Sequence, residues 1–199
     1  MKLYYADPSP YSRKVRVVIR EKRLESIVHE VYCNPYDDGP ELKAVNPLRK
    51  IPALVTDHGT LFDSPVICAY LDGLNSTPRL IPQGDDRWPV LKTEALADGI
   101  MDALVAVVIE RRRPPEKQSQ RWQEYCFNVV RRCIEAIPEE QAAQERPFSL
   151  AHIAVASALG YADFRTPELD WRALSPHIAE WYEGVSSRPS FVDTPHPSA

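Results

Sequence analysis

The sequence predicts an α/β unit with a mixed four-stranded sheet, followed by an all-helical unit. Short runs rich in aromatic and β-branched residues alternate with helical patterns throughout residues 1–74. Residues 75–86 are rich in Pro, Gly, Asn and Asp, a composition typical of a linker. After it, residues 87–199 show apolar residues at helical spacing and no strand pattern. We therefore expect two domains, at 1–74 and 87–199, joined by this linker.

The N-terminal elements can be placed from residue types. The strand patterns fall at residues 2–6, 27–33, 51–56 and 61–62. The last two are expected to form a hairpin, because Asp57-His58-Gly59 between them contains residue types that favour a turn. Ser9-Pro10 and Ser64-Pro65 each begin a helix, since serine is a favoured N-cap and proline a favoured first helical residue. The first of these helices runs to about Arg23, and residues 41–45 form at most a short helix.

Serine and proline also bound the helices of the second domain. Four helical patterns begin at Arg87, near Trp122, at Ser149 and at Ser175. The first is long and ends at about Arg113, because Pro114-Pro115 cannot continue a helix. Between Ala95 and Ile109 this helix is apolar on several sides, so we expect it to be buried against more than one neighbour.

Composition excludes several classes of protein. With 199 residues, 44% hydrophobic and 26% charged, the chain is of ordinary globular composition and is not a disordered one. Its longest apolar run, residues 103–109, is too short to span a bilayer, and the first residues do not resemble a signal peptide. A net charge of -4 disfavours nucleic acid as a partner. The four cysteines form no Cys-x-x-Cys pair, which predicts no metal site, no disulfide framework and a location in the reducing cytoplasm.

The two Ser-Pro helix starts of the first domain are candidates for a binding site. A helix N-terminus presents unpaired N–H groups and the positive end of the macrodipole, so it favours an anion. Ser9 adds a hydroxyl that can donate to such an anion. Asp63, beside Ser64, adds a carboxylate that can hold a cation next to an anion, as in the amino-acid end of a ligand. The alternative is that both serines are plain structural caps.

Ile51-Pro52 is the third candidate. A proline at the start of a strand cannot donate to the ladder, so this edge of the sheet is incomplete. The backbone of Ile51 could then pair with a short extended peptide. The bond between Ile51 and Pro52 can be cis or trans, and the residues alone leave both open.

At this point the chain resembles the glutathione transferase superfamily, and in particular its bacterial YibF-type serine homologues. The motifs that carry the resemblance are residues 9–16 (SPYSRKVR), 46–54 (NPLRKIPAL), 62–67 (FDSPVI), 94–103 (EALADGIMDA) and 188–191 (RPSF). Each motif is weak alone, but their order and spacing are specific and extend over nearly the whole chain. The resemblance implies a thioredoxin-like N-terminal domain and an all-helical C-terminal domain.

The resemblance also implies a glutathione site. Ser9 stands where serine-type members hold the glutathione sulfur, and Ile51 where a backbone pair holds the cysteinyl residue, with Pro52 cis. Asp63 and Ser64 stand where the γ-glutamyl amine and carboxylate bind. This agrees with the amino-acid end of a ligand that the two Ser-Pro helix starts and Asp63 indicated. In addition, Lys50 either reaches the glycyl carboxylate or is a solvated lysine.

The implied activity is that of a homodimeric glutathione transferase. Glutathione would be the co-substrate, Ser9 would stabilise its thiolate, and the thiolate would add to small electrophiles, with no metal involved. The alternatives are a glutathione-binding or scaffold protein without turnover, and a glutathione-dependent peroxidase.

Tyr5, Tyr11 and Met101 are candidates for contacting the electrophile. Glu94, Asp98 and Asp102 either form a solvated acidic stripe or line a cleft or partner surface.

Two departures from the family pattern are informative. Members that use a catalytic cysteine carry it near the position of Ser9, where this chain has none, so we expect no disulfide exchange through an enzyme thiol. Many members also have an acidic residue three positions after the cap of a C-terminal helix. Here Ser149 is followed by His152, so we expect the reciprocal carboxylate bond of that capping box to be lost.

Overall fold

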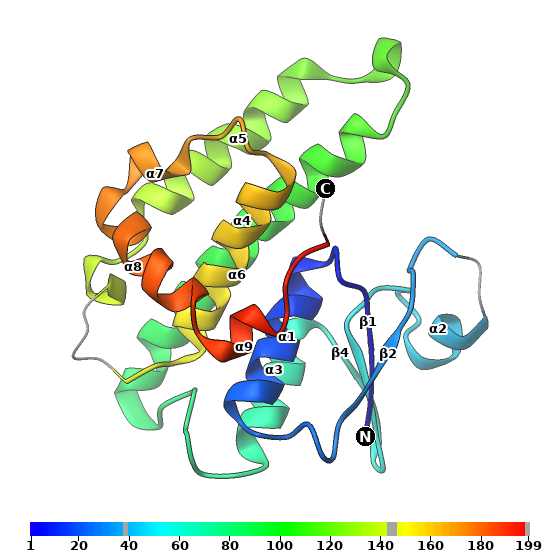
Figure 1. The fold of residues 1–199 in the computed structure, drawn as a ribbon. Helices are drawn as coiled ribbons and strands as arrows, with labels where there is room; N and C mark the ends of the chain where they lie inside the picture. Colours follow the sequence, from blue (N-terminus) through cyan, green and yellow to red (C-terminus); the bar gives the residue numbers. More distant parts are fainter. Residues whose placement is uncertain (38–39, 143–146, 198–199) are drawn as a thin grey trace. The chain divides into compact units, whose positions relative to one another are not determined.

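The computed structural model describes residues 1–37, 40–142 and 147–197 (Figure 1). The chain forms two compact units. The N-terminal unit comprises Met1–Gln83 together with the stretch that begins at Arg188, and the helical unit comprises Gly84–Ser187. The expected boundaries therefore need two corrections, because most of the expected linker and residues 188–197 both belong to the N-terminal unit. Within the described residues, no helix is long and apolar enough to cross a membrane.

The N-terminal unit contains a mixed four-stranded sheet, as predicted. Its strands are β1 (Lys2–Tyr5), β2 (His29–Tyr32), β3 (Ala53–Thr56) and β4 (Gly59–Phe62). Their order is β2-β1-β3-β4, with β1 parallel to β2 and the other two pairs antiparallel. Gly59 closes the β3–β4 hairpin with a φ of 120°, a conformation that disfavours side chains. β4 begins at Gly59, two residues before the start of the predicted strand.

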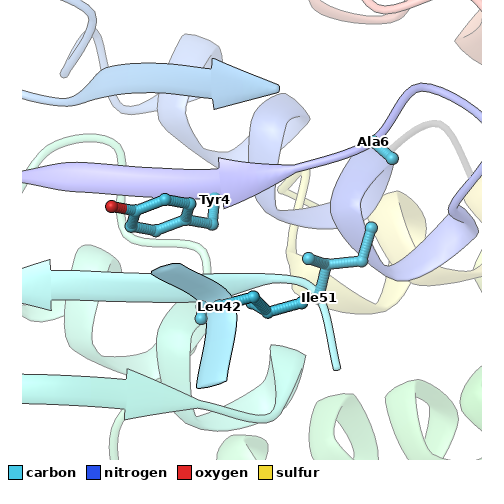
Figure 2. Packing of buried hydrophobic residues seen from close by; sticks show 5 residues of the cluster. Tyr4, Ala6, Leu42 and Ile51 are labelled. Atoms are coloured by element: carbon cyan, nitrogen blue, oxygen red, sulfur yellow. The ribbon is translucent and has the colours of Figure 1, made fainter. Parts of the chain in front are cut away.

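Helices cover both faces of this sheet (Figure 1). On one face lie α1 (Pro10–Glu21) and α3 (Ser64–Gly73), which pack against each other, and on the other lies the short α2 (Pro40–Val45). Figure 2 shows the apolar cluster on the α2 side, formed by Tyr4, Ala6, Leu42, Ile51 and Ala53. This cluster joins α2 to the end of β1 and to the start of β3.

A buried ion pair explains why residues 75–83 belong to the N-terminal unit. The Nζ atom of Lys22 lies 2.9 Å from Asp72 Oδ1 and donates to the backbone carbonyls of Asn75 and Pro78. The Asp72 carboxylate in turn accepts hydrogen bonds from the backbone N–H groups of residues 80–81. Because a buried ammonium group needs partners on all its hydrogens, Lys22 ties this stretch to α1 and α3. The stretch is consequently an ordered part of the unit, although its composition is that of a linker.

The helical unit is all-helical over its described residues, as predicted. Its α-helices are α4 (Arg87–Arg111), α5 (Gln120–Glu135), α6 (Leu150–Arg165), α7 (Trp171–Leu174) and α8 (Pro176–Ser186). The predicted long helix is α4, which packs against both α5 and α6. α6 is buried along most of its length and forms the centre of the unit.

His152 restores the capping box that we expected to be incomplete. Its Nδ1 atom accepts the backbone N–H of Ser149 at 3.0 Å and lies 2.8 Å from the Ser149 hydroxyl oxygen. The imidazole therefore performs the reciprocal function that a glutamate performs in the usual motif. Its ring also stacks on Phe148, with ring centroids 5.3 Å apart. The expectation of a lost reciprocal bond was wrong because it considered only carboxylates as acceptors.

Candidate functional site

The register of the sheet places the three candidate motifs at one edge. Ser9 follows the end of β1, Ile51 precedes the start of β3, and Ser64 follows the end of β4. Because β3 runs antiparallel to both β1 and β4, the end of each neighbour lies beside its start. Figure 2 shows Ile51 and Ala6 at this same end, beyond Tyr4. Segments that are far apart in the sequence thus meet at a single edge of the N-terminal unit.

Ser9 is the N-cap of α1, as its Ser-Pro signature predicts. Its backbone is extended, with φ -86° and ψ 121°, and its Oγ accepts the backbone N–H of Ser12 at 3.2 Å. Because Oγ is the acceptor in this bond, its own O–H remains able to donate. Ser9 is half-buried at the positive end of a twelve-residue helix. A donor hydroxyl and a helix dipole therefore act at the same place.

The Ile51–Pro52 peptide bond is cis, which decides between the two isomers that the residues left open. The β1–β3 ladder ends at the pair Tyr4 and Ala53, so Ile51 lies outside it. The Ile51 side chain is buried in the apolar cluster, which anchors the residue while its backbone stays at the sheet edge.

Asn46 organises the loop that leads to Ile51, and the sequence analysis assigned it no role. Its side chain is only 1% exposed. Nδ2 donates to the carbonyl of Lys50 at 2.7 Å, and Oδ1 accepts the backbone N–H of Leu48 at 2.9 Å. The loop also contains Arg49 at a φ of 53°, in the left-handed region. The Asn46-Pro47 dipeptide was a turn signal that could have drawn attention to this residue.

Asp63 and Ser64 differ from the predicted arrangement by one residue. The N-cap of α3 is Asp63, whose carbonyl accepts the N–H of Ile67 at 3.1 Å, and Ser64 is the first helical residue. Asp63 has a φ of 72°, which is rare and strained for a residue with a side chain. The expected Ser64 cap bond is therefore absent. Ser64 is 2% exposed, and its buried hydroxyl has no hydrogen-bond partner among the described residues.

An ionic network lies between α1 and the strands that lead to the site. Arg16 contacts the Asp7 carboxylate at 2.9 Å and the Glu30 carboxylate at 2.8 Å, and its guanidinium lies over the Tyr5 ring. Burial alone would raise the pKa of Glu30, but hydrogen bonds and charges from Arg20 and Arg16 outweigh it and lower the pKa. Burial raises the pKa of the Tyr5 phenol, so Tyr5 is a proton donor and not an anion at neutral pH.

The other candidates divide by exposure. Lys50 is exposed next to Ile51, and Tyr11 is half-buried on α1. Met101 is fully buried on α4, so its side chain is not at a surface. The three α4 carboxylates differ in exposure, since Glu94 is 3% exposed, Asp98 is half-buried and Asp102 is exposed.

One cysteine lies near this edge, because Cys33 follows β2 and packs against the apolar cluster that contains Ile51. None of the four cysteines, Cys33, Cys68, Cys126 and Cys133, forms a disulfide. Burial raises the pKa of Cys33, which follows β2, and nearby carboxylates act in the same direction. Within residues 1–37, 40–142 and 147–197, no three His, Cys, Asp or Glu side chains are arranged to hold a metal ion.

Comparison with known proteins assigns the family. Residues 8–74 match the family described as "Glutathione S-transferase, N-terminal domain" and residues 116–184 match "Glutathione S-transferase, C-terminal domain". The chain is 35% identical over 205 residues, spanning the whole of both chains, to "Uncharacterized GST-like protein YibF" of Escherichia coli K12.

Solved structures agree with these matches. A glutathione transferase family member from Pseudomonas fluorescens Pf-5, crystallised with bound glutathione, is 41% identical with a TM-score of 0.93, covering 99% of each chain. A second structure from that organism, with bound S-(propanoic acid)-glutathione, is 42% identical with a TM-score of 0.88 over the full length of both chains. Taken with the fold and the family matches, these likenesses show that the chain belongs to the glutathione S-transferase family.

Proposed function

We propose that the N-terminal unit binds glutathione at the sheet edge formed around Ser9, Ile51 and Ser64, and that the protein transfers it to small electrophiles. The observation that carries the proposal is the buried Ser64 hydroxyl, which has no partner among the described residues. Leaving such a group unpaired costs about 1–3 kcal/mol, so a ligand that supplies the partner is the simplest reason for it. The strained Asp63 beside it points the same way.

Each motif then takes one part of the ligand. The Ser64 hydroxyl and the N-terminal N–H groups of α3 bind the γ-glutamyl carboxylate, and the exposed Asp63 carboxylate binds the adjacent ammonium group. The backbone of Ile51 pairs with the cysteinyl residue in the manner of an added strand. Lys50, exposed beside it, reaches the glycyl carboxylate. The relative from Pseudomonas fluorescens, solved with bound glutathione and with a glutathione derivative, supports glutathione as the ligand.

Ser9 is the catalytic residue in this proposal. Its O–H donates to the glutathione sulfur, and the α1 N-terminus adds a favourable dipole. Both interactions favour the thiolate over the thiol, whose ordinary pKa is about 8.5. A depression of two pKa units, which corresponds to about 2.7 kcal/mol, leaves most of the thiol ionised at neutral pH. Ser9 itself forms no covalent bond in this proposal. The described contact of its hydroxyl is with the backbone N–H of Ser12, which is not a base that could deprotonate it.

An α,β-unsaturated carboxylate is one electrophile class that fits the comparison. S-(propanoic acid)-glutathione, bound in the relative that is 42% identical, has the skeleton that results when a glutathione thiolate adds to such an acid. In that step the sulfur electron pair forms a bond to the β-carbon. The displaced π pair moves to the α-carbon, which takes a proton from water. The enzyme needs no oxidant or metal for this reaction.

Calorimetric titration with glutathione, followed by a substrate screen, tests the proposal. We expect saturable binding and an ultraviolet thiolate band at neutral pH. Turnover is then measured with acrylate, an aryl halide and an organic hydroperoxide. Turnover of either electrophile supports transfer, whereas turnover of the hydroperoxide alone replaces it with peroxidase activity. Binding without any turnover would make the protein a glutathione-binding protein, and no binding at all would overturn the assignment of the site.

We also propose that the protein works as a homodimer in the reducing cytoplasm. The apolar stretch of α4 is covered only in part, since Val105 and Val108 are half-buried and Ile109 is 49% exposed. A partner subunit would cover such a face. Cysteines that form no disulfides suit a reducing compartment. Sedimentation at micromolar concentration should give about twice the chain mass, and a monomer there would contradict the dimer.

A further inference from the structure

The end of the chain runs along the whole of α1. We call residues 188–197, which include α9 (Pro189–Val192), the C-terminal strap. Figure 1 shows the strap in red beside the blue α1. It begins at the C-terminal turn of α1, where Arg188 donates to both carboxylate oxygens of Glu21 at 3.0 and 2.8 Å. Ser190 adds a third hydrogen bond to the same carboxylate at 2.6 Å.

The middle of the strap is anchored by an aromatic residue. Phe191 is almost fully buried, and the guanidinium carbon of Arg13 lies 5.4 Å from the centre of its ring. Arg13 also donates to the Phe191 carbonyl, although the contact is long at 3.4 Å. Three residues further on, Thr194 is fully buried and donates to the carbonyl of Ser190 at 2.8 Å. These contacts hold the strap against the helix whose N-terminus forms the candidate site.

The strap ends at the turn that precedes Ser9. Nδ1 of His196 lies 3.3 Å from the backbone carbonyl oxygen of Asp7. A carbonyl oxygen only accepts hydrogen bonds, so the contact requires the ring hydrogen to be on Nδ1. Pro8 has no N–H, so this carbonyl is the only hydrogen-bonding group of the peptide between Asp7 and Pro8. His196 therefore holds the one polar group through which that peptide can be oriented.

This turn determines where Ser9 points. The N–H of Ser9 donates to the carbonyl of Ala6 at 3.0 Å, which closes a four-residue turn with the Asp7–Pro8 peptide at its tip. The Asp7 side chain is held separately by Arg16, at 2.9 Å. Side chain and backbone of Asp7 are thus fixed by two different elements, α1 and the strap. Rotation of the Asp7–Pro8 peptide would move Ser9 relative to the N-terminus of α1.

We propose that His196 is a positioning residue that fixes the Ser9 turn and so aims the Ser9 hydroxyl at the glutathione sulfur. The inference rests on the proposed function and adds a residue to it. Donors stabilise a developing or bound anion best when they are held in place beforehand, and displacements of about 1 Å are enough to weaken catalysis strongly. His196 lies near the end of the strap, 187 residues after Ser9 in the sequence. No local sequence pattern could therefore indicate its contact with the Ser9 turn.

Two substitutions separate the hydrogen bond from the packing of the ring. His196→Phe keeps an aromatic ring but removes the donor. His196→Asn removes the ring but keeps a donor, because the amide nitrogen of Asn is two bonds from Cβ, as Nδ1 is in histidine. His29→Ala is the matched control, since His29 is exposed and begins β2 at the opposite end of the sheet.

The readouts are the pKa of the bound glutathione thiol, from its ultraviolet band at saturating glutathione, and kcat and KM with an electrophile that the wild type turns over. We expect His196→Phe to raise the thiol pKa by about half a unit and to lower kcat about threefold, with KM for glutathione nearly unchanged. His196→Asn should recover most of both losses, and His29→Ala should match the wild type.

Several outcomes would overturn the inference. If the thiol pKa and kcat of His196→Phe equal those of the wild type, the strap is only structural, whether or not the variant is less stable to heat. Equal losses in His196→Phe and His196→Asn would show that ring packing matters and the hydrogen bond does not. Failure of the proposed function is distinguishable, because the wild type itself would then bind no glutathione or form no thiolate, before any variant is examined.

Discussion

Two helices of the N-terminal unit begin with the same dipeptide, Ser-Pro, but the two serines are used differently. Ser9 precedes α1 as its N-cap, and its oxygen accepts the N–H of Ser12. Ser64 is already inside α3, and its buried oxygen has no partner among the described residues. The comparison shows that one local signature can either satisfy a helix end or leave a hydroxyl available to a ligand.

The lengths of the connections explain the difference. Between the end of β1 at Tyr5 and the start of α1 at Pro10, four residues form a turn, which leaves room for an extended cap. Between β4, which ends at Phe62, and α3, which starts at Ser64, only Asp63 remains. Asp63 must reverse the chain by itself, and it does so with a φ of 72°. This short connection makes Asp63 the N-cap and moves Ser64 into the first helical turn.

The largest effect that would test this comparison is expected from Ser64→Ala. Removing a hydroxyl that binds a charged group should weaken glutathione binding by about 1–3 kcal/mol, roughly tenfold to a hundredfold in Kd. Thermal stability should stay the same or rise slightly, because the hydroxyl has no partner among the described residues. Calorimetry and thermal melts measure the two quantities. Unchanged affinity together with a lower melting temperature would mean that Ser64 is a cap after all.

Ser9→Ala should show the opposite balance. Loss of the N-cap should reduce the free energy of unfolding by about 1 kcal/mol. The bound thiol pKa should rise toward its free value and activity should fall more than glutathione affinity, because the lost interaction favours the thiolate. The thiol pKa is measured at saturating glutathione. If it is the same in both proteins, the backbone N–H groups of α1 activate the thiol and Ser9 is only structural.

Asp63→Gly should separate strain from binding. Glycine adopts positive φ freely, so this variant should be more stable by up to about 1 kcal/mol. It also lacks the carboxylate, so glutathione affinity should fall. Asp63→Asn is the matched control, because it keeps the side-chain size and lacks the charge. Equal glutathione affinities in all three proteins would show that Asp63 serves the chain reversal and not the ligand.

The smallest effect concerns pH. Burial alone would raise the pKa of Glu21, but hydrogen bonds from Arg188 and Ser190 and the Arg188 charge outweigh it, so its pKa is lowered, as is that of Glu30. A carboxyl with a lowered folded pKa contributes stability above its unfolded pKa, about 4.3, and this is lost as the pH falls through the folded value. Thermal melts should show a loss of less than about 1 kcal/mol for each group, since both are partly solvated.

Glu21→Gln and Glu30→Gln provide the check on this assignment. Each substitution should flatten part of the acid limb of the stability curve, and their effects should be largest near neutral pH. Glu30→Gln removes the charge that pairs with Arg16 and Arg20. Glu21→Gln weakens the contacts of α1 with Arg188 and Ser190 of the strap. An acid limb that is identical in both variants and in the wild type would assign the pH dependence to other carboxyl groups.

Local signals predicted much of the fold and of the candidate site. The Ser-Pro starts, the hairpin turn and the apolar periodicities depend on neighbours in sequence, so the order of elements, the mixed sheet and the Ser9 cap followed from them. Asn46, in contrast, acts through hydrogen bonds across its loop to Leu48 and Lys50, and residue type alone does not reveal such bonds. His152 was misjudged because an imidazole nitrogen can accept where a carboxylate usually does.

The sequence by itself determined the elements, the two-part division and the resemblance to glutathione transferases, because propensity, periodicity and motif spacing act over a few residues. Only the tertiary structure decided which residues complete the N-terminal unit. The Lys22–Asp72 pair draws in residues 75–83, and Glu21 and Asp7 bind the strap that begins at Arg188. Such bonds form between groups brought together by packing, which is why His196 reaches the Ser9 turn although nothing near either residue in the sequence indicates it.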